Sequence, residues 1–318
     1  MKILVYIQQD QGKISSVSLE ALKGAQDIAA KIGGSVTVIT FNSEAGNVLA
    51  GYDIAETLVI EDDLLKIYNP LFYIKALEEI NTKEAPDVIV CGHTYEARDW
   101  VPRLSARLNI PLISDCIGFK MDSKLTLTRS IYQGKFNSDV AVNEGVFIIS
   151  FQSGAFRADA IQSGSNTIRN VSIDLSGISD SIKPGKKFQE AESSVDLSQA
   201  DVIVSVGRGI GKKENMPLAK ELAATLKGEL ASSRPVVDSG WLESYHQVGS
   251  SGQTVSPKLY LALGISGAIQ HVVGMKGSKN IVVINKDANA PIFEIADYGV
   301  VGDLFEIVPK LITAIQNS

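Results

Sequence analysis

Cysteine is scarce in this sequence, which excludes several kinds of site. The chain has 318 residues but only two cysteines, Cys91 and Cys116, which lie far apart and form no CxxC pair. Iron–sulfur clusters, structural zinc sites and disulfide frameworks need more cysteines or closer spacing. Both cysteines lie in or beside apolar strand patterns. We therefore expect two small buried side chains and no metal site.

The sequence also lacks a long hydrophobic run and an excess of positive charge. No apolar run approaches the roughly 20 residues that a membrane-spanning helix needs. The net charge of −6 at pH 7 offers no basic field for nucleic acid or an anionic membrane surface. The strand-like residues 3–7 follow the N-terminus directly, without the organisation of a signal or transit peptide. We expect a cytoplasmic protein with no nucleic-acid partner and no membrane insertion.

Standard catalytic motifs are missing as well. The sequence contains no G-x-S-x-G elbow, no Walker A loop, no H-E-x-x-H pair and no strict G-x-G-x-x-G fingerprint. Its carboxylates show no spacing that is typical of an acid/base pair. This pattern fits a chain that binds a cofactor tightly and has no substrate machinery of its own.

What is present is the composition and patterning of a folded α/β protein. Hydrophobic residues make up 45% and charged residues 21%, which excludes a largely disordered chain. Up to about residue 122, short apolar runs alternate with longer helical patterns, which predicts a parallel sheet covered on both faces. The predicted strands lie near 3–8, 35–41, 57–60, 87–92 and 112–117, and the predicted helices near 17–32, 69–84 and 95–109.

The alternation stops after residue 122. Three apolar stretches follow one another with only turn-sized gaps, at 125–128, 136–142 and 145–151. Such spacing predicts an antiparallel pair or meander that extends the sheet. The polar run at 181–200, with Pro184 and Gly185, is then the best candidate for a linker.

We place a domain boundary near residue 190, between an N-terminal domain (1–190) and a C-terminal domain (191–318). The second domain again alternates strands, at 201–206, 259–263, 281–284 and 299–301, with helices at 217–227 and 304–316. Pro217 suits a first helical turn and Asp303 can cap the last helix. The fold class is therefore α/β with two doubly wound domains, the first a mostly parallel sheet with an antiparallel extension and the second Rossmann-like.

Glycine, serine, arginine and acidic residues gather where the strands of the second domain end. Because the carboxyl ends of parallel strands meet at one sheet edge, these stretches should converge on a single ligand-binding crevice. The stretches are 207–209, 232–234, 249–252, 264–267 and 285–287. Their donors fit a ligand with a pyrophosphate, a sugar chain and a flat polar ring, such as a dinucleotide. The missing fingerprint disfavours a standard nicotinamide site.

Residues 264–271 read GISGAIQH and connect a predicted strand to a helix. A Gly-x-x-Gly turn before a helix that begins near Ala268 directs several unpaired backbone N–H groups outward, which suits a phosphate or another anion. Gln270 and His271 then lie in the first helical turn, beside that ligand. Taken alone, His271 is equally compatible with a core histidine.

Longer motifs resemble the signature of the electron transfer flavoprotein α subunit. They read LYLALGISGAIQH at 259–271, GM at 274–275, INKD at 284–287, APIF at 290–293 and ADYG at 296–299. The resemblance is specific across about 201–318 and extends in length and layout across 1–190. It implies one FAD held mainly by the second domain, a heterodimer with a β subunit, and an electron carrier rather than an enzyme with its own substrate.

The resemblance also implies partners and contacts. Acyl-CoA or other flavin dehydrogenases would be the electron donors, as in fatty acid oxidation, and a quinone oxidoreductase or another protein the acceptor. Ser233 and Arg234 match a Ser-Arg pair whose arginine lies near the isoalloxazine, and His271 matches a histidine that donates to the flavin C2 carbonyl. The implied FAD-binding residues are Arg208, Ser233, Arg234, Val248, Gly249, Ser250, Ser251, Ser266, Gly267, Ala268, Ile269, Gln270, His271, Asn285, Asp303 and Leu304.

One loop departs from the family pattern. Many members have VGQTG where this chain has VGSSG at 248–252. Ser251 is expected to replace the hydroxyl near flavin N5, while the glutamine amide is missing at Ser250. The resemblance leaves open whether the β subunit carries AMP, as in simple carriers, or a second FAD, as in bifurcating complexes.

The expected chemistry concerns the negative charge that a flavin acquires at N1–C2=O with its first electron. A charge-assisted hydrogen bond of roughly 1.5–3 kcal/mol corresponds to roughly 65–130 mV for one electron. We expect a neutral His271, because a helix N-terminus opposes its protonation, with Arg234 supplying the full charge. The residues themselves leave two other functions open, an NAD(P)-dependent oxidoreductase and a nucleotide-sensing module.

Overall fold

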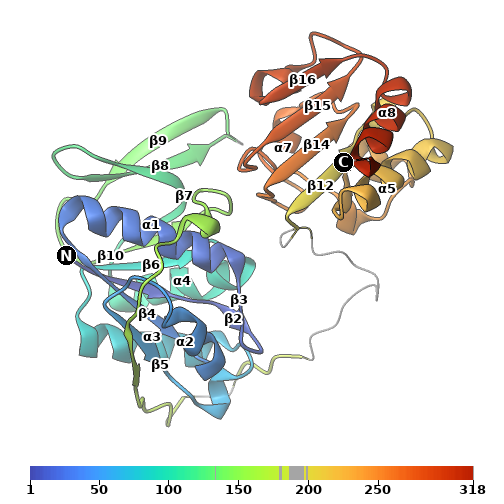
Figure 1. Ribbon diagram of the computed structural model, residues 1–318. Coiled ribbons are helices and arrows are strands. Elements are labelled where there is room, and N and C mark those ends of the chain that lie inside the picture. Colours follow the sequence, from blue (N-terminus) through green and yellow to red (C-terminus); the bar gives the residue numbers. More distant parts are fainter. Residues whose placement is uncertain (133, 179–180, 186–196, 198–199, 318) are drawn as a thin grey trace. The chain divides into compact units, whose positions relative to one another are not determined.

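The computed structural model describes residues 1–132, 134–178, 181–185, 197 and 200–317. The chain separates into two compact units, unit 1 mainly from residues 1–187 and unit 2 mainly from 188–318. Each unit has its own sheet and its own helices (Figure 1). Most of the linker expected at 181–200 lies outside the described residues, so the boundary near residue 190 stays a prediction.

Unit 1 is built on a nine-stranded sheet in the order β11-β5-β4-β1-β6-β10-β7-β8-β9. Neighbouring strands from β11 to β7 run parallel, and β8 and β9 add an antiparallel extension. The strands are β1 (Lys2–Tyr6), β4 (Ser35–Thr40), β5 (Glu56–Val59), β6 (Val88–Gly92), β7 (Leu112–Met121), β8 (Leu125–Ile131), β9 (Phe136–Ala141), β10 (Phe147–Phe151) and β11 (Thr167–Asn170). A small hairpin of β2 (Gln9–Asp10) and β3 (Lys13–Ile14) follows β1.

Helices bury both faces of this sheet, which explains why its central strands are largely apolar. Helix α1 (Ser16–Ile32) packs on one face, and α3 (Pro70–Glu84) and α4 (Tyr95–Leu108) pack on the other (Figure 1). Helix α2 (Ser43–Leu49) and the short turns η1 (Asp63–Leu65) and η2 (Ala158–Ala160) complete the described unit. None of the helices in the described residues is both long and apolar enough to cross a membrane.

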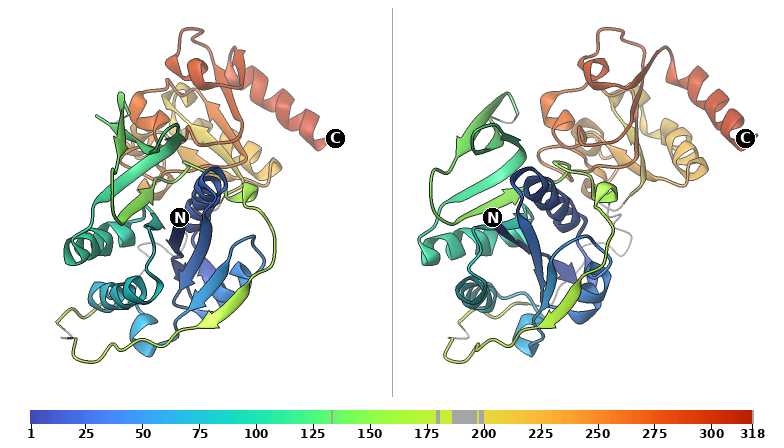
Figure 2. Two further views of the ribbon diagram at one scale, coloured as in Figure 1. Left: turned by 90° about the vertical axis from the view of Figure 1, so that its left-hand side faces the viewer. Right: turned by 60° about the vertical axis from the view of Figure 1, so that its left-hand side comes forward.

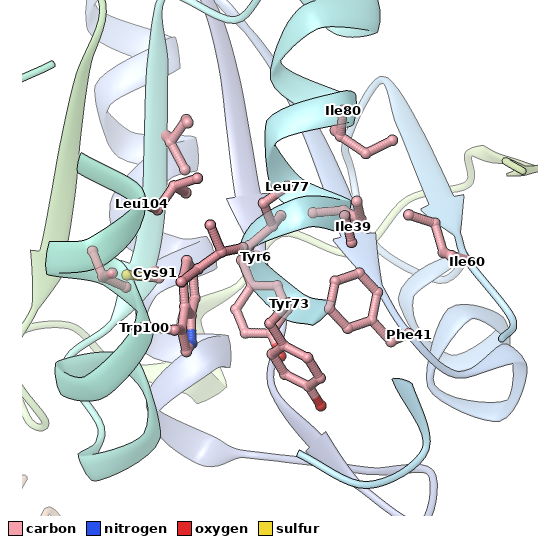
Figure 3. Packing of buried hydrophobic residues seen from close by; sticks show 14 of the residues in the cluster. Tyr6, Ile39, Phe41, Ile60, Tyr73, Leu77, Ile80, Cys91, Trp100 and Leu104 are labelled. Carbon is pink, nitrogen blue, oxygen red and sulfur yellow. The ribbon is translucent and has the colours of Figure 1, made fainter. Parts of the chain in front are cut away.

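Four aromatic rings form the centre of the core beneath α3 and α4 (Figure 3). Trp100 is fully buried, and its ring centroid lies 5.0 Å from that of Tyr6 in an edge-to-face arrangement. Phe41 and Tyr73 form a second edge-to-face pair at 4.9 Å. Such pairs add stabilisation beyond their buried area. The core of unit 1 therefore depends strongly on these rings.

The antiparallel extension was predicted correctly in part. Strands β8 and β9 form the expected pair beyond β7 (Figure 2). The third stretch, expected at 145–151 within a meander, is instead β10, which inserts in parallel between β6 and β7. All five residues of β10 are buried. A continuous apolar run of that kind is typical of a central parallel strand, and the turn-sized gap concealed this return to the middle of the sheet.

Unit 2 is a five-stranded parallel sheet in the order β13-β12-β14-β15-β16. From β12 (Val202–Val206) the chain proceeds to β13 (Glu229–Ser232) on one side. From β14 (Leu259–Leu263) it proceeds to β15 (Ile281–Asn285) and β16 (Tyr298–Val301) on the other. The strand order therefore reverses between β12 and β14, and such a point is where doubly wound sheets bind ligands.

The two faces of this sheet are covered differently. Helices α5 (Met216–Thr225) and α8 (Leu304–Gln316) bury one face, whereas α7 (Ile269–Val272), η7 (Pro291–Ile295) and loops cover the other (Figure 1). Helix α8 begins after Asp303, whose carboxylate accepts a hydrogen bond from the Phe305 N–H at 2.8 Å, as the sequence predicted. The remaining short elements are η4 (Arg208–Ile210), η5 (Lys213–Asn215), α6 (Arg234–Asp238) and η6 (Ser244–His246).

Candidate functional site

A cleft of about 240 Å³ opens at the carboxyl edge of the unit 2 sheet. It lies where the strand order reverses, between the turns that follow β12 and β14. Four of the five polar stretches that the sequence singled out meet here, and the stretch 249–252 does not line the cleft. The lining residues are Gly207, Arg208, Gly209, Ser233, Pro235, Gly264, Ser266, Asn285, Asp287, Ala290 and Pro291.

Glycine allows the two central turns to touch and to form the floor of the cleft from backbone. A Cβ atom on Gly207 would lie 2.3 Å from the Gly264 carbonyl oxygen, and one on Gly264 would lie 2.7 Å from the Gly209 Cα. Gly264 also adopts φ +60°, in the left-handed region that favours glycine. Side chains at these positions would fill the cradle that the turns create.

The turn 264–270 directs its carbonyl oxygens inward and leaves N–H groups unpaired. The Ile265 oxygen accepts from Asn285 Nδ2 at 2.8 Å, and the Ser266 oxygen accepts from the Ile292 N–H at 3.2 Å. Among the described residues, none of the N–H groups from 266 to 270 donates to another backbone group. Successive unpaired N–H groups form a concavity that binds anions. The turn therefore offers a place for a phosphate group.

Three polar side chains surround the floor of this cleft, those of Ser233, Asn285 and Arg208. Ser233 and Asn285 are 7% and 8% exposed, and Asn285 uses its amide internally, with Oδ1 accepting from the Asp287 N–H at 3.0 Å. Arg208 is exposed at the start of η4. The cleft lining thus combines one cation and one carboxylate with hydroxyl and amide groups.

Arg234 lies beside Ser233 but outside the cleft lining. Its guanidinium is exposed and approaches Asp238 at 3.5 Å. Exposed pairs of this kind contribute little to stability. Arg234 is therefore free to exchange this partner for a ligand, and its expected position near a flavin ring stays a prediction.

The loop 248–251 lies against α7 rather than in the cleft. The Ser250 N–H donates to the Gln270 oxygen at 2.7 Å, and a Cβ on Gly249 would lie 2.7 Å from the same oxygen. The Ser251 hydroxyl accepts a hydrogen bond from Gln247 Nε2 at 2.9 Å. Ser250 and Ser251 are exposed next to the exposed residues 268–270. These residues form a second group of predicted contacts beside the cleft.

The last two predicted contacts lie where β16 leads into α8. The Gly302 N–H donates to the Asn285 oxygen at 3.0 Å, which brings this turn next to the end of β15. The carboxylate of Asp303 caps α8, and the Leu304 side chain is buried in the core. A ligand contact at Leu304 therefore has to involve its backbone.

His271 points into the unit, away from the cleft. Its side chain is buried, with Nε2 2.9 Å from the Tyr260 hydroxyl and Nδ1 3.1 Å from the Val248 oxygen. Burial lowers the pKa of His271 to about 4, so the ring is neutral at pH 7. The neutral state was expected, but its cause is burial rather than the four-residue helix α7. Both ring nitrogens already have partners within unit 2. A hydrogen bond from His271 to a flavin carbonyl would have to replace one of them, and it stays a prediction.

Burial of His271 makes the stability of unit 2 depend on pH. Between pH 6.5 and about pH 4, His271 is protonated in the unfolded chain but stays neutral in the folded one. Stability is therefore lost as the pH falls through this window, by about 2 kcal/mol at pH 5 relative to pH 7.5. Urea unfolding at both pH values should show a larger loss for the wild type than for His271→Asn. Equal losses would contradict this assignment.

Sequence reasoning missed the hydroxyl of Tyr260 that contacts His271. The available signal was a tyrosine inside a strand whose other residues are all apolar, because a buried phenol nearly always has a hydrogen-bond partner. The identity of that partner follows only from how α7 folds back over β14.

Comparison with protein families agrees with this geometry. Residues 3–176 match the family model described as the electron transfer flavoprotein domain, and residues 196–276 match the one described as the electron transfer flavoprotein FAD-binding domain. The chain belongs to the electron transfer flavoprotein family. The resemblance read from the motifs at 259–299 is thereby confirmed, and the cofactor of the second domain is FAD.

Several curated relatives are similar along all or most of their length. The electron transfer flavoprotein subunit alpha of Thermoanaerobacterium thermosaccharolyticum is 38% identical over 99% of this chain and 98% of its own. The subunit of the same name from Bacillus subtilis is 35% identical over 98% of this chain and 96% of its own. Subunit LctC of a lactate dehydrogenase (NAD(+),ferredoxin) from Acetobacterium woodii is 32% identical over 99% of this chain and 77% of its own.

The cleft fits FAD in its donor chemistry. Because glycines form its floor, a ligand can contact the main chain directly. The unpaired N–H groups of 266–270, together with Arg208, suit a pyrophosphate. Ser233 and Asp287 add groups that can bind sugar hydroxyls.

Proposed function

We propose that this chain is the FAD-carrying α subunit of a heterodimeric electron transfer flavoprotein. Residues 191–318 hold the cofactor, and residues 1–190 are a scaffold that packs against a β subunit. The observation that carries the proposal is the glycine-floored cleft at the β12/β14 switch point. Seven of its eleven lining residues lie in the part of the chain that matches an FAD-binding domain. Full-length similarity to chains named as α subunits supports the heterodimer.

Bound FAD accepts and releases electrons one at a time. The task of this chain is to bind and orient it. The N–H groups of 266–270 and the Arg208 guanidinium would bind the pyrophosphate, and the Ser233 hydroxyl would bind a further polar group of the cofactor. Asn285 holds the lining in place, because its amide is bonded to Ile265 and Asp287. Arg234, Ser250 and Ser251 are exposed, and a flavin ring beside them would be accessible to partner proteins. There the positive charge of Arg234 would favour added negative charge on the ring.

The donors we propose are acyl-CoA or other flavin dehydrogenases, with a quinone oxidoreductase or another redox protein as acceptor. A bifurcating complex is the second candidate. It is favoured by relatives named as a subunit of a lactate dehydrogenase (NAD(+),ferredoxin) and as an electron transfer subunit of acryloyl-CoA reductase. The two candidates differ in the cofactor of the β subunit.

Flavin counting tests this proposal. The chain coexpressed with its β partner should purify as a yellow heterodimer that releases one FAD on denaturation, or two if it belongs to a bifurcating complex. Arg208→Ala should weaken FAD binding about 10- to 100-fold, because a charge-assisted hydrogen bond is lost. The matched control is Lys220→Ala, which removes an exposed cation from α5.

A colourless protein would contradict the proposal. Binding of NAD(P)H by this chain alone, with catalysis in the absence of any partner, would favour an oxidoreductase with its own substrate pocket. Equal FAD affinity in Arg208→Ala and Lys220→Ala would remove Arg208 from the site while leaving the family assignment unchanged.

A further inference from the structure

The loop 247–253 is anchored to two segments that form the cleft of unit 2. At its base the Val248 N–H donates to the oxygen of Ser232, the last residue of β13, at 2.9 Å. Further along, the Ser250 N–H donates to the Gln270 oxygen at 2.7 Å, at the end of the turn that follows β14. The turns after β13 and β14 both contribute residues to the cleft lining. The loop therefore adjoins the cleft at both of its anchors.

The loop is also closed on itself, which constrains the direction of its side chains. The Gln253 N–H donates to the Gln247 oxygen at 2.7 Å, and the Gly249 N–H donates to the Gln253 oxygen at 3.1 Å. A Cβ atom on Gly252 would lie 2.3 Å from the Gln247 oxygen, so the two ends of the loop are in close backbone contact. The side chains at the tip of the loop are thus carried by a well-defined backbone.

The Ser251 hydroxyl has a partner that determines where its proton points. Gln247 is 8% exposed, and its Nε2 lies 2.9 Å from the Ser251 Oγ. An amide nitrogen only donates, so the Ser251 oxygen accepts at this contact and its own proton points elsewhere. Among the described residues, no group accepts that proton. Since Ser251 is exposed, it offers a hydrogen-bond donor to a ligand.

The size of the cleft leaves part of the cofactor for such contacts. The cleft volume is about 240 Å³, below the roughly 300–1,000 Å³ of pockets that enclose a drug-sized ligand. A dinucleotide is larger than most ligands of that class. Part of the FAD therefore extends beyond the lining residues, and the loop 247–253 adjoins the cleft where that part can lie.

We propose that Gln247 is a positioning residue of the FAD site, which holds the Ser251 hydroxyl as a donor to an acceptor atom of the flavin ring. The inference deepens the proposed function and rests on it for the flavin readouts. The edge of an oxidised flavin ring presents nitrogen and carbonyl lone pairs, which need a donor rather than a second acceptor. A donor becomes still more favourable when the ring gains negative charge. Gln247 thus raises the affinity for FAD and its midpoint potential by acting through Ser251.

Gln247→Glu reverses the polarity of this contact. A carboxylate only accepts, so the Ser251 hydroxyl would turn its proton toward residue 247 and present lone pairs to the ligand. This change alone should weaken FAD binding by the heterodimer about 3- to 10-fold at pH 8, the size expected for one neutral hydrogen bond. The midpoint potential should fall by up to about 59 mV, the one-electron equivalent of 10-fold.

A double-mutant cycle with Ser251→Ala separates this effect from that of the added charge. Without the hydroxyl, Gln247→Glu acts through its charge and packing alone, so it should weaken FAD binding about 3- to 10-fold less in the Ser251→Ala background than in the wild type. Ser251→Thr keeps the hydroxyl and should keep the wild-type affinity. The matched control is Ser250→Ala, which removes the neighbouring exposed hydroxyl and should show no coupling to Gln247→Glu.

Nitrogen NMR of the ¹⁵N-glutamine-labelled heterodimer gives a readout that is independent of flavin chemistry. The signal of the Gln247 side-chain amide is assigned by its loss in Gln247→Glu. Ser251→Ala should move this signal, because it removes the acceptor of the Nε2–H group. Ser250→Ala should leave the signal in place.

The outcomes separate this inference from the proposed function. An unmoved amide signal in Ser251→Ala, or an equal effect of Gln247→Glu with and without the Ser251 hydroxyl, overturns the inference and leaves FAD binding by the chain unaffected. A wild-type heterodimer that binds no FAD contradicts the proposed function, and with it the flavin role of Gln247, even where the amide signal moves as expected.

Discussion

Gly264→Ala should destabilise unit 2 by about 2–4 kcal/mol and abolish retention of FAD. Two costs add up. Alanine at φ +60° loses roughly 1 kcal/mol in the left-handed region, and its Cβ would lie 2.7 Å from the Gly209 Cα. Because the overlapping atoms are backbone, the turns must separate, and their separation destroys the floor of the cleft.

Gly240→Ala is the matched control for this substitution. Gly240 has nearly the same backbone conformation, φ +66°, but a Cβ there would meet nothing within 4 Å. The control should therefore show the conformational cost alone, roughly 1 kcal/mol, and should keep its FAD. Urea unfolding followed by circular dichroism measures the loss of stability in both variants, and the flavin content of each purified variant is measured separately. Equal losses in the two variants would show that the close approach of the turns contributes nothing.

Trp100→Ala should destabilise unit 1 by about 3–5 kcal/mol, the usual cost of emptying a fully buried aromatic site. Trp100 belongs to α4 and is completely buried against Tyr6, in the core that α4 shares with α3 (Figure 3). Its loss leaves a cavity beside the edge-to-face ring pair. Circular dichroism should detect unfolding of unit 1 at a lower urea concentration than in the wild type.

The variant also allows the two units to be monitored separately. The chain has two tryptophans, and the second, Trp241, belongs to unit 2, so its fluorescence in Trp100→Ala reports on that unit alone. We expect a midpoint close to that of the wild type for this signal. Trp100→Phe, which keeps an aromatic ring, should show a clearly smaller loss. A shift in the Trp241 transition equal to the shift in circular dichroism would contradict independent unfolding of the units.

Regular elements were predictable because local patterning determined them. The helix at 304–316 has an aspartate cap and apolar spacing, and the strand at 259–263 is a short apolar run between Lys258 and Gly264. Both have the bounds expected. The convergence of four polar stretches followed from parallel strand order alone. These features require no knowledge of distant contacts.

Features that depend on distant partners were less accessible. The strand β10 was expected next to β9, but its pairing with β6 and β7 depends on burial on both faces of the sheet. The loop 249–252 follows no sheet strand, and its position beside α7 comes from contacts to Gln270. His271 lies in the first turn of a helix as expected, yet the direction of its ring is determined by Tyr260 and Val248, which are distant in sequence.

The cleft floor of crossing main-chain turns has a consequence for how this family can diversify. Exchange of side chains cannot widen or recharge a surface that consists of peptide groups, so we expect a cofactor bound above it to keep one position wherever these glycines are preserved. We therefore expect adjustment of redox behaviour to be confined to the residues around the cleft, such as Ser250 and Ser251, where this chain departs from the family pattern.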